Sequence, residues 1–300
     1  MISSPTRRGF PLGQATFRCM KRCLFLTVIC LFALVEASPT NNYDAPMASA
    51  TPVIDGVADA MWNLAPWDSI NYTWLNGTPP APSDFSGRYK ILWDVNRLYL
   101  LVEIVDDSLS DVTANPLDAY WDDDCVEIFL DENHNGGDHA ANYSAFSYHV
   151  STVFDVVDIG EDGQPHLYND HITTARTRLG NTYLWEMSIK VFGEDYTYAG
   201  PNSPLTLALG KILGFTLAYC DNDGGSSREN FMGSVNTQGH IDNLGYQDAS
   251  VFGTLHLVSA ASSALVKSTR QSPENIAYKR FQVNGAKPRL GAKARGTYAH

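Results

Sequence analysis

The stretch YWDDDCVEIFLDENHNGG, residues 120–137, brings aromatic, acidic and strand-forming residues together at a spacing that suits ligand binding. It opens on two aromatic residues and carries six carboxylates. Its centre, DCVEIFLD (124–131), alternates as a β-strand does, so successive side chains point to opposite faces of a sheet. One face, the expected core face, carries Val126, Ile128 and Leu130.

Glu127 shares the other face of this strand with Cys125 and Phe129. A carboxylate on a partly apolar face needs polar partners. Two interpretations fit this position. Glu127 is either a polar anchor in a ligand-binding groove or a glutamate at the rim of the sheet that forms a salt bridge.

A second expected strand, AFSYHVSTVF (145–154), shows a similar pattern. Ser147 and His149 share one face, and their side chains can hydrogen-bond the hydroxyl groups of a ligand. Taken alone, a histidine in a strand is more often a surface or core residue whose hydrogen bonds are made within the protein or to water.

Trp121 precedes the first of these strands in a loop. The apolar face of a sugar ring stacks on an aromatic side chain, while its hydroxyls need polar partners around the edge. Trp121 beside Glu127 therefore suits a sugar. Three other tryptophans fit regular apolar patterns or a helix-like turn and are expected in the core: Trp62, Trp93 and Trp185.

Two polar loops offer the oxygen ligands that calcium prefers. The loop DENHNGGDH (131–139) supplies Asp131, Glu132, Asn133, Asn135 and Asp138. The loop DNDGG (221–225) supplies Asp221 and Asp223, but it lacks the later glutamate of an EF-hand. Both loops also read as ordinary turns, because Asn, Asp and Gly favour turns.

Strand patterns separated by Gly, Pro, Asn and Asp recur along the chain, and no long amphipathic helix pattern is present. This predicts an all-β fold, a β-sandwich or jelly roll of antiparallel sheets. The expected strands are 87–94, 97–106, 124–131, 145–154, 171–178, 182–191, 211–221 and 251–258.

The two ends of the chain differ from its middle. Residues 1–37 contain Met20-Lys21-Arg22, an apolar run and small residues, as a cleaved secretory signal peptide does, and Met20 is a possible true start. The apolar run is too short for a membrane span. We expect a linker over 38–50, one domain over 51–258 and a basic, disordered tail over 259–300. The protein is therefore expected to be secreted, either to the periplasm or outside the cell.

Charge is unevenly distributed. All but two of the 33 acidic residues lie within 38–258, whereas 13 of the 21 basic residues lie outside that range. Such an acidic domain repels phosphate backbones, which argues against nucleic-acid binding. Cys125 and Cys220 lie in separate expected strands; export permits a disulfide between them, but two buried free thiols are the favoured interpretation.

Several blocks together resemble carbohydrate-binding module family 9. They are TPVIDGVADAMWN, YKILWDVNRLYLLVEIVDDSL, WDDDCVEIFLDEN and the closing VFGTLHLV, and they run from about Thr51 to Val258. The resemblance implies a β-sandwich in which two aromatic side chains clamp a sugar, with calcium supporting the loops. Modules of this kind are usually attached to a xylanase or another hydrolase, which implies an association with xylan or glucan breakdown.

The resemblance also implies particular site residues. Trp121 matches the first clamp aromatic, Glu127 the strand glutamate that bonds sugar hydroxyls, and Asn243 a further polar group. Ser147 and His149 stand where the family has an arginine and an asparagine, and Tyr246 stands where it has the second clamp tryptophan. These departures leave the identity of the sugar open.

We therefore predict a non-catalytic, monomeric module that binds a mono-, oligo- or polysaccharide between Trp121 and Tyr246. Hydrogen bonds would come from Glu127, His149 and Asn243, with Ser147 a lesser candidate. Arg228, in the loop after DNDGG, would add a charged donor.

Two alternatives remain open. A glycoside hydrolase would need two carboxylates about 5–9 Å apart, such as Glu127 with Asp122, Asp123 or Asp124. A haem b electron-transfer domain would need an axial pair such as Met232 and His149.

Overall fold

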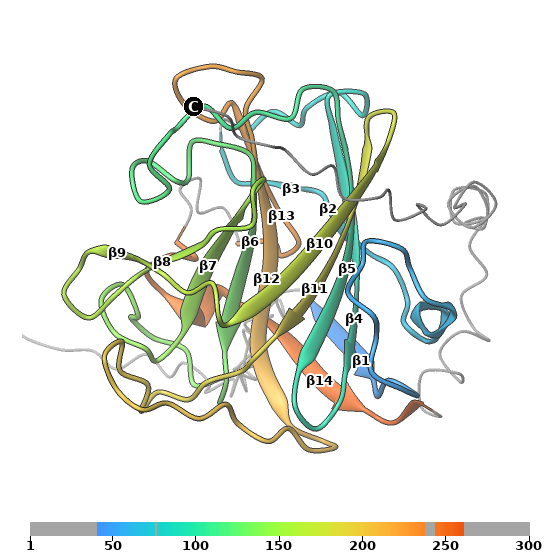
Figure 1. Cartoon of the computed structure of the whole chain (residues 1–300), viewed down its shortest axis with the longest axis vertical. Helices are drawn as coiled ribbons and strands as arrows, with labels where there is room; N and C mark the ends of the chain where they lie inside the picture. The colour runs from blue at the N-terminus through green and yellow to red at the C-terminus, as the bar shows by residue number, and fades with distance from the viewer. Residues whose placement is uncertain (1–40, 76, 238–243, 261–300) are drawn as a thin grey trace, which may run out of the picture. The chain divides into compact units, whose positions relative to one another are not determined.

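The computed structural model describes residues 41–75, 77–237 and 244–260. The expected signal peptide, most of the expected tail and Asn243 lie outside these residues. In the described part of the chain the strands form two sheets, which confirms the predicted all-β sandwich (Figure 1). No helix there is both long and apolar enough to cross a membrane.

The first sheet carries the residues of the candidate site. Its described strands run in the order β1 (Asn42–Pro46), β14 (Gly253–Val258), β12 (Ile212–Asp221), β6 (Cys125–Asp131), β7 (Phe146–Ser151), β8 (Val156–Ile159) and β9 (Pro165–Leu167). Beside β12 this sheet is extended by β13 (Asn230–Gly233) and β3 (Tyr72–Thr73).

The second sheet covers one face of the first. Its described strands run in the order β10 (Ile172–Leu179), β11 (Thr182–Ile189), β5 (Leu98–Asp106), β4 (Phe85–Trp93) and β2 (Asp68–Ile70). Two short 3₁₀ helices, η1 (Ala60–Leu64) and η2 (Ala249–Val251), complete the described elements.

The main core lies between the two sheets, as the alternation of the strands predicts. From β6 it receives Val126, Ile128 and Leu130, all of them buried. The three tryptophans predicted for the interior are buried as well: Trp62, Trp93 and Trp185. Trp62 packs on the outer side of the second sheet, where η1 covers it.

The predicted linker 38–50 is wrong in part, because β1 lies within it. β1 pairs in parallel with β14, and its Tyr43 and Ala45 are buried in the main core. The segment NYDAP carries only these two inward-facing residues between polar ones. This pattern is too short for sequence periodicity to reveal, and only pairing with the last strand makes it a strand.

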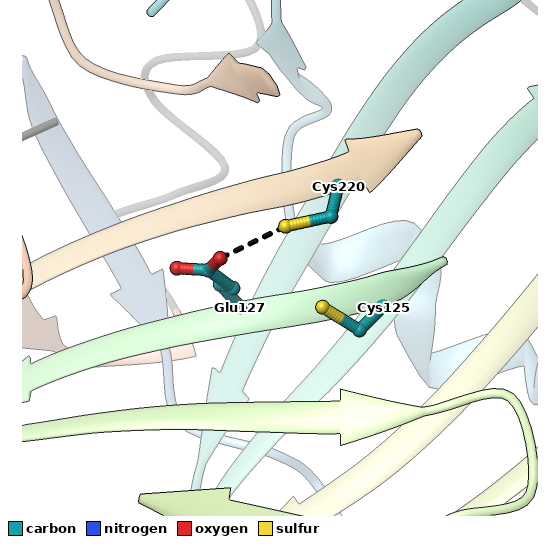
Figure 2. A group of neighbouring side chains, drawn as sticks. All are labelled: Cys125, Glu127 and Cys220. Carbon is teal, nitrogen blue, oxygen red and sulfur yellow. Dashed lines mark hydrogen bonds between the residues drawn. The ribbon is translucent and has the colours of Figure 1, made fainter. Parts of the chain in front are cut away.

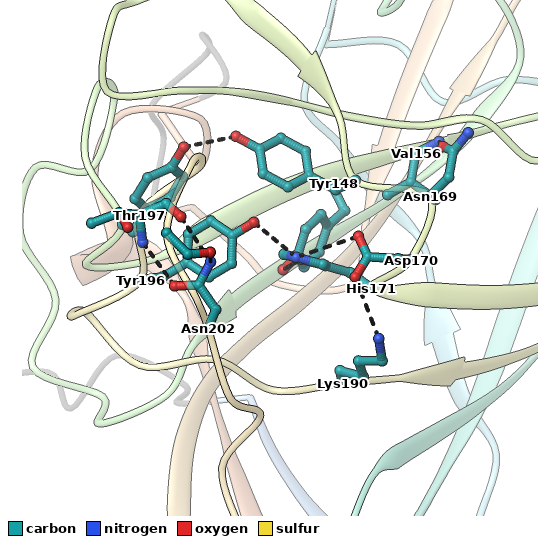
Figure 3. A network of polar contacts seen from close by, with 12 residues as sticks. Tyr148, Val156, Asn169, Asp170, His171, Lys190, Tyr196, Thr197 and Asn202 are labelled. Atoms are coloured by element: carbon teal, nitrogen blue, oxygen red, sulfur yellow. Dashed lines mark hydrogen bonds and ion pairs between the residues drawn. The ribbon is translucent and has the colours of Figure 1, made fainter.

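A buried histidine directly before β10, His171, contacts two tyrosine hydroxyls in the core. The hydroxyl of Tyr148 lies 2.8 Å from Nδ1 of His171, and that of Tyr196 lies 3.1 Å from Nε2 (Figure 3). Burial lowers the pKa of His171 to about 4, so the ring is neutral at neutral pH. Its neighbour Asp170 pairs with Lys190 at 3.4 Å. This network fixes the chain rather than offering a site.

Candidate functional site

The outer face of the first sheet carries a second, smaller apolar cluster with charged groups inside it. β12, β6 and β7 lie side by side here, and their register places Cys220 opposite Cys125 and Glu127 opposite His149. The predicted division of β6 into two faces is thus confirmed. The cluster consists of Trp74, Cys125, Phe129, Ala145, Ala218, Cys220, Phe231, Val235, Ala249 and Phe252.

Glu127 is fully buried and is the centre of the polar contacts on this face. Its Oε1 accepts a hydrogen bond from Sγ of Cys220 at 2.9 Å (Figure 2). The same oxygen lies 2.9 Å from Nε2 of His149 and pairs with Arg228 at 3.2 Å. Its Oε2 is buried without a hydrogen-bond partner among the described residues. Burial raises the pKa of Glu127, but His149 and Arg228 outweigh burial, so the pKa is lowered overall.

His149 is held on both sides. Its Nδ1 lies 3.0 Å from the carbonyl oxygen of Ser147, and the ring of Tyr120 packs edge-on against the imidazole at 4.6 Å. The hydroxyl of Ser147 is buried and has no hydrogen-bond partner in the described part of the chain. Glu127, His149 and Ser147 therefore lie together, as predicted, but beneath the surface rather than on it.

Arg228 connects this buried group to the surface. Its guanidinium lies 4.0 Å from the centre of the Phe231 ring and donates to Sγ of Cys220 at 3.0 Å as well as to Glu127. Its side chain keeps 17% exposure, so Arg228 is not fully enclosed.

The two predicted clamp aromatics are both exposed, with 42% exposure for Trp121 and 48% for Tyr246. Trp121 lies 5.0 Å from Tyr120 between ring centres and so adjoins the Glu127–His149 end of β6. The Tyr246 loop meets the sheet elsewhere, because the carbonyl of Gly245 contacts His139, whose ring packs on Phe252. That the two rings face each other stays a prediction.

The structure gives the acids before Glu127 other partners. Asp122 accepts from the backbone of Arg228, Asp123 accepts from the backbone amides of Val112 and Thr113, and Asp124 is buried. The alternative haem pair is excluded, since Met232 packs in the main core whereas His149 lies on the outer face of the same sheet.

In the predicted calcium loop after β6, backbone amides of the loop already bind one of its carboxylates. Asp131 accepts hydrogen bonds from the amides of Asn133, His134 and Gly136, at 3.1, 2.9 and 2.9 Å. Glu132 pairs with Lys211 at 2.7 Å. In the rest of the loop Asn133 caps Asn135, and Asp138 caps Ala140. Calcium binding by these residues stays a prediction, and the turn interpretation accounts for their contacts.

A stronger cation candidate surrounds Asp221 and Asp223. Oxygen atoms of Asp106, Asp124 and Asp221 lie within 4.8 Å of one another, and all three residues are buried. Two further groups of the same kind include more exposed acids. One consists of Asp106, Asp107 and Asp223, and the other of Asp84, Asp223 and Glu229. We call these seven residues the acidic cluster.

No ion pair between described residues neutralises the three buried carboxylates of the acidic cluster. Oδ1 of Asp221 is buried without a hydrogen-bond partner in the described chain. Burial and repulsion from Asp106 raise the pKa of Asp124 to about 9 and that of Asp221 to about 7. The amides of Ser110 and Asn222 at Asp124, and the hydroxyl of Tyr219 at Asp106, stabilise the anions only in part, and a bound cation would stabilise them further.

Sequence reasoning did not assign Asp106 or Asp124 to a cation site, and it did not join Cys125 and Cys220 to Glu127 in one group. Asp106 and Asp124 stand at the ends of strands, where acids usually face solvent, and only the meeting of β5, β6 and β12 buries them together. Cys125 and Cys220 were recognised as buried thiols, which the structure confirms, but their contact with Glu127 depends on the strand register.

Comparison with known proteins yields a family match. Residues 54–260 match the family described as "Carbohydrate family 9 binding domain-like". The chain is also 29% identical over 219 residues to "Exoglucanase XynX" of Acetivibrio thermocellus, and 28% identical over 218 residues to "Endo-1,4-beta-xylanase A" of Thermoanaerobacterium saccharolyticum. These alignments cover 73 and 72% of this chain but only 17 and 16% of the two relatives.

Solved structures show the same fold. A carbohydrate binding module family 9 from Caldicellulosiruptor kristjanssonii in complex with cellotriose gives a TM-score of 0.55 at 24% identity, covering 73% of this chain and 94% of that one. A carbohydrate binding module family 9 from the same organism in complex with glucose gives a TM-score of 0.53 at 23% identity, with 73% of this chain and 96% of that one covered.

Proposed function

This chain belongs to the carbohydrate family 9 binding domain-like family, and we propose that it is a non-catalytic module that binds a sugar at Trp121. The observation that carries the proposal is the position of the exposed Trp121 indole, next to Tyr120 and the charged group of Glu127, His149 and Arg228. A sugar stacked on the indole would meet the partly exposed Arg228 side chain at its edge.

The buried residues take an indirect role in this proposal. Glu127 is closed off from solvent, so it orients Arg228 rather than reaching the sugar itself. His149 in turn supports Glu127 and Tyr120. Tyr246 would either complete a clamp with Trp121 or contact a neighbouring unit of a longer chain.

The comparisons indicate which sugars to test. The structural neighbour was solved with cellotriose and with glucose, and the relatives are named as an exoglucanase and a xylanase. We therefore propose glucose-based and xylose-based saccharides as ligands, within a protein that takes part in polysaccharide breakdown. We further propose that it acts as an exported monomer, which mass measurement on the protein from culture medium would check.

Replacing Trp121 with alanine should weaken saccharide binding about 5–30-fold, because loss of one stacked ring removes about 1–2 kcal/mol. Isothermal calorimetry with glucose, cellotriose and xylo-oligosaccharides measures this. Leu209→Ala is the control. Leu209 is also exposed, but it lies just before the first residue of β12, whereas the proposed site adjoins the last residues of that strand. Unchanged heat of binding in the Trp121 variant would exclude the proposed site.

The same titration decides whether a clamp exists. If Trp121 and Tyr246 hold one sugar ring between them, the losses in binding free energy caused by Trp121→Ala and by Tyr246→Ala should not add up in the double variant. If the losses in binding free energy are additive and appear only with longer saccharides, the two aromatic side chains contact separate sugar units.

The protein should release no reducing sugar from xylan or cellulose. Among the described acids directly before Glu127, Asp122, Asp123 and Asp124 each accept a backbone hydrogen bond, so none of the three is a free second carboxylate. A reducing-sugar assay measures this at high protein concentration. Release that disappears in Glu127→Gln would instead support the hydrolase alternative.

We also propose that calcium occupies the acidic cluster. The unpartnered oxygen of Asp221 and the absence of a pairing cation for the described carboxylates support it. Asp106, Asp124 and Asp221 would hold the ion through carboxylate oxygens, which calcium prefers. Because Asp124 directly precedes β6, an ion bound to it would fix the loop that carries Trp121.

A further inference from the structure

The two cysteines and the buried glutamate form a donor set that the sugar proposal leaves unexplained. The Sγ atoms of Cys125 and Cys220 and a carboxylate oxygen of Glu127 lie within 4.8 Å of one another, and all three residues are buried (Figure 2). Two thiols and a carboxylate converging in the interior are unusual for a site that only supports a sugar. We propose that Cys125, Cys220 and Glu127 bind a zinc ion.

The strand geometry suits a shared metal better than a disulfide. Cys125 and Cys220 are direct cross-strand partners, and Cβ atoms at such positions lie about 4.5–5.5 Å apart. A disulfide needs a shorter Cβ separation of about 3.5–4.5 Å. Two thiolates on one zinc ion, each at about 2.3 Å from the metal, are separated by about 3.8 Å and need no such compression.

Glu127 can complete the coordination. Its Oε1 already contacts Sγ of Cys220 at 2.9 Å, and its Oε2 is buried with no described hydrogen-bond partner. One carboxylate can therefore contribute one or both oxygens, with water at a remaining position, which is the usual composition of a zinc site with three protein ligands.

His149 acts as the positioning residue. Both of its ring nitrogens face acceptors, the carbonyl oxygen of Ser147 at 3.0 Å and Glu127 at 2.9 Å. It therefore holds Oε1 of Glu127, the oxygen that Cys220 also contacts, and leaves Oε2 available to a metal, as hydrogen-bonded outer residues do for ligating carboxylates.

Charge balance also fits. Binding releases the two thiol protons to solvent, and a zinc ion with two thiolates and one carboxylate carries one net negative charge. The guanidinium of Arg228, at 3.0 Å from Sγ of Cys220, offsets that charge.

Cobalt titration tests the proposal, because thiolate ligation of Co²⁺ gives charge-transfer and visible bands that carboxylates do not. The full chain is used with Cys19, Cys23 and Cys30 replaced by serine, so that Cys125 and Cys220 are the remaining thiols. Excess calcium saturates the acidic cluster. We expect about one equivalent of Co²⁺ with thiolate bands, displaced by Zn²⁺, and a raised thermal midpoint.

Variants assign the ligands. Cys125→Ser and Cys220→Ser should each lose the thiolate bands, and His149→Gln should weaken Co²⁺ binding about 10–100-fold. His166→Gln is the matched control, because His166 contacts Asp162 at the same 2.9 Å but at the surface, and it should bind as the parent does.

Two results would overturn the proposal. One is the absence of thiolate bands in protein whose two thiols react as free. The other is a mass lower by the two thiol hydrogens, which would show that the cysteines form a disulfide. Both are read on the parent protein, so they do not depend on whether a variant folds.

Discussion

Calcium should raise the thermal midpoint of this protein by about 10 °C at pH 8 and by far less at pH 5. A ligand present at 1,000 times its dissociation constant stabilises the folded state by about 4 kcal/mol. For a domain of this size that corresponds to about 8–16 °C. Scanning calorimetry in EDTA and in calcium chloride, at both pH values, measures the difference.

The dependence on pH follows from the raised pKa values. The pKa of Asp124 rises from 3.8 to about 9, and that of Asp221 from 3.8 to about 7. Without metal, the folded state therefore binds protons that the unfolded state releases. That stabilisation is complete below pH 4 and is lost as the pH rises through 7 to 9. Calcium replaces the protons, so it matters most at high pH.

Two asparagine variants locate the ion. Asp221→Asn should raise the midpoint of the metal-free protein at pH 8, because it removes one repelling charge, and should abolish most of the calcium response. Asp131→Asn changes an equally buried aspartate whose oxygens are held by backbone amides, and it should keep that response. The reverse pattern would place calcium in the loop 131–138 and refute the acidic cluster as the site.

Glu127→Ala should lower the free energy of unfolding by about 3–5 kcal/mol, because it removes the buried carboxylate that pairs with Arg228 and hydrogen-bonds His149. Arg228 and His149 would lose contacts of 3.2 and 2.9 Å inside a largely buried cluster. Urea unfolding with a zinc-selective chelator present measures the effect without metal binding. Glu127→Gln keeps the shape and part of the hydrogen bonding, so it should cost less.

The control for this prediction is Asp162→Ala. Asp162 also contacts a histidine at 2.9 Å, but its side chain is 57% exposed, so its loss should leave the free energy of unfolding nearly unchanged. The pKa of Glu127 is lowered from 4.5, so the difference between parent and Glu127→Ala should be full above pH 4.5 and shrink as the pH falls further. Equal effects of the two variants would show that burial of Glu127 contributes nothing.

Sequence patterns predicted the architecture well because strand alternation is a local property. All of the expected strands exist, with ends that differ by three residues or fewer. The short strands β1, β2, β3, β8, β9 and β13 were missed, since each has too few inward-facing residues to show a period. They become strands only through pairing with partners elsewhere in the chain.

The candidate site divides in the same way. The order of residues in β6 and β7 alone placed Glu127 and His149 on the face away from the core, and the loop before β6 alone suggested an available Trp121. Depth did not follow from the sequence, because Glu127 is buried among His149, Cys220 and Arg228, which lie on other segments of the chain. Alternation determines which way a side chain points, whereas only packing decides whether solvent reaches it.

The sequence by itself therefore determined the all-β fold, the two faces of its central strands and the family to which the chain belongs. The tertiary structure decided which acids meet. It joined Asp106, Asp124 and Asp221 from three strands, and it set Cys125 and Cys220 around Glu127. Such groups are made by contacts between residues far apart in the chain, such as Asp106 and Asp221, and no local pattern encodes the register that brings them together.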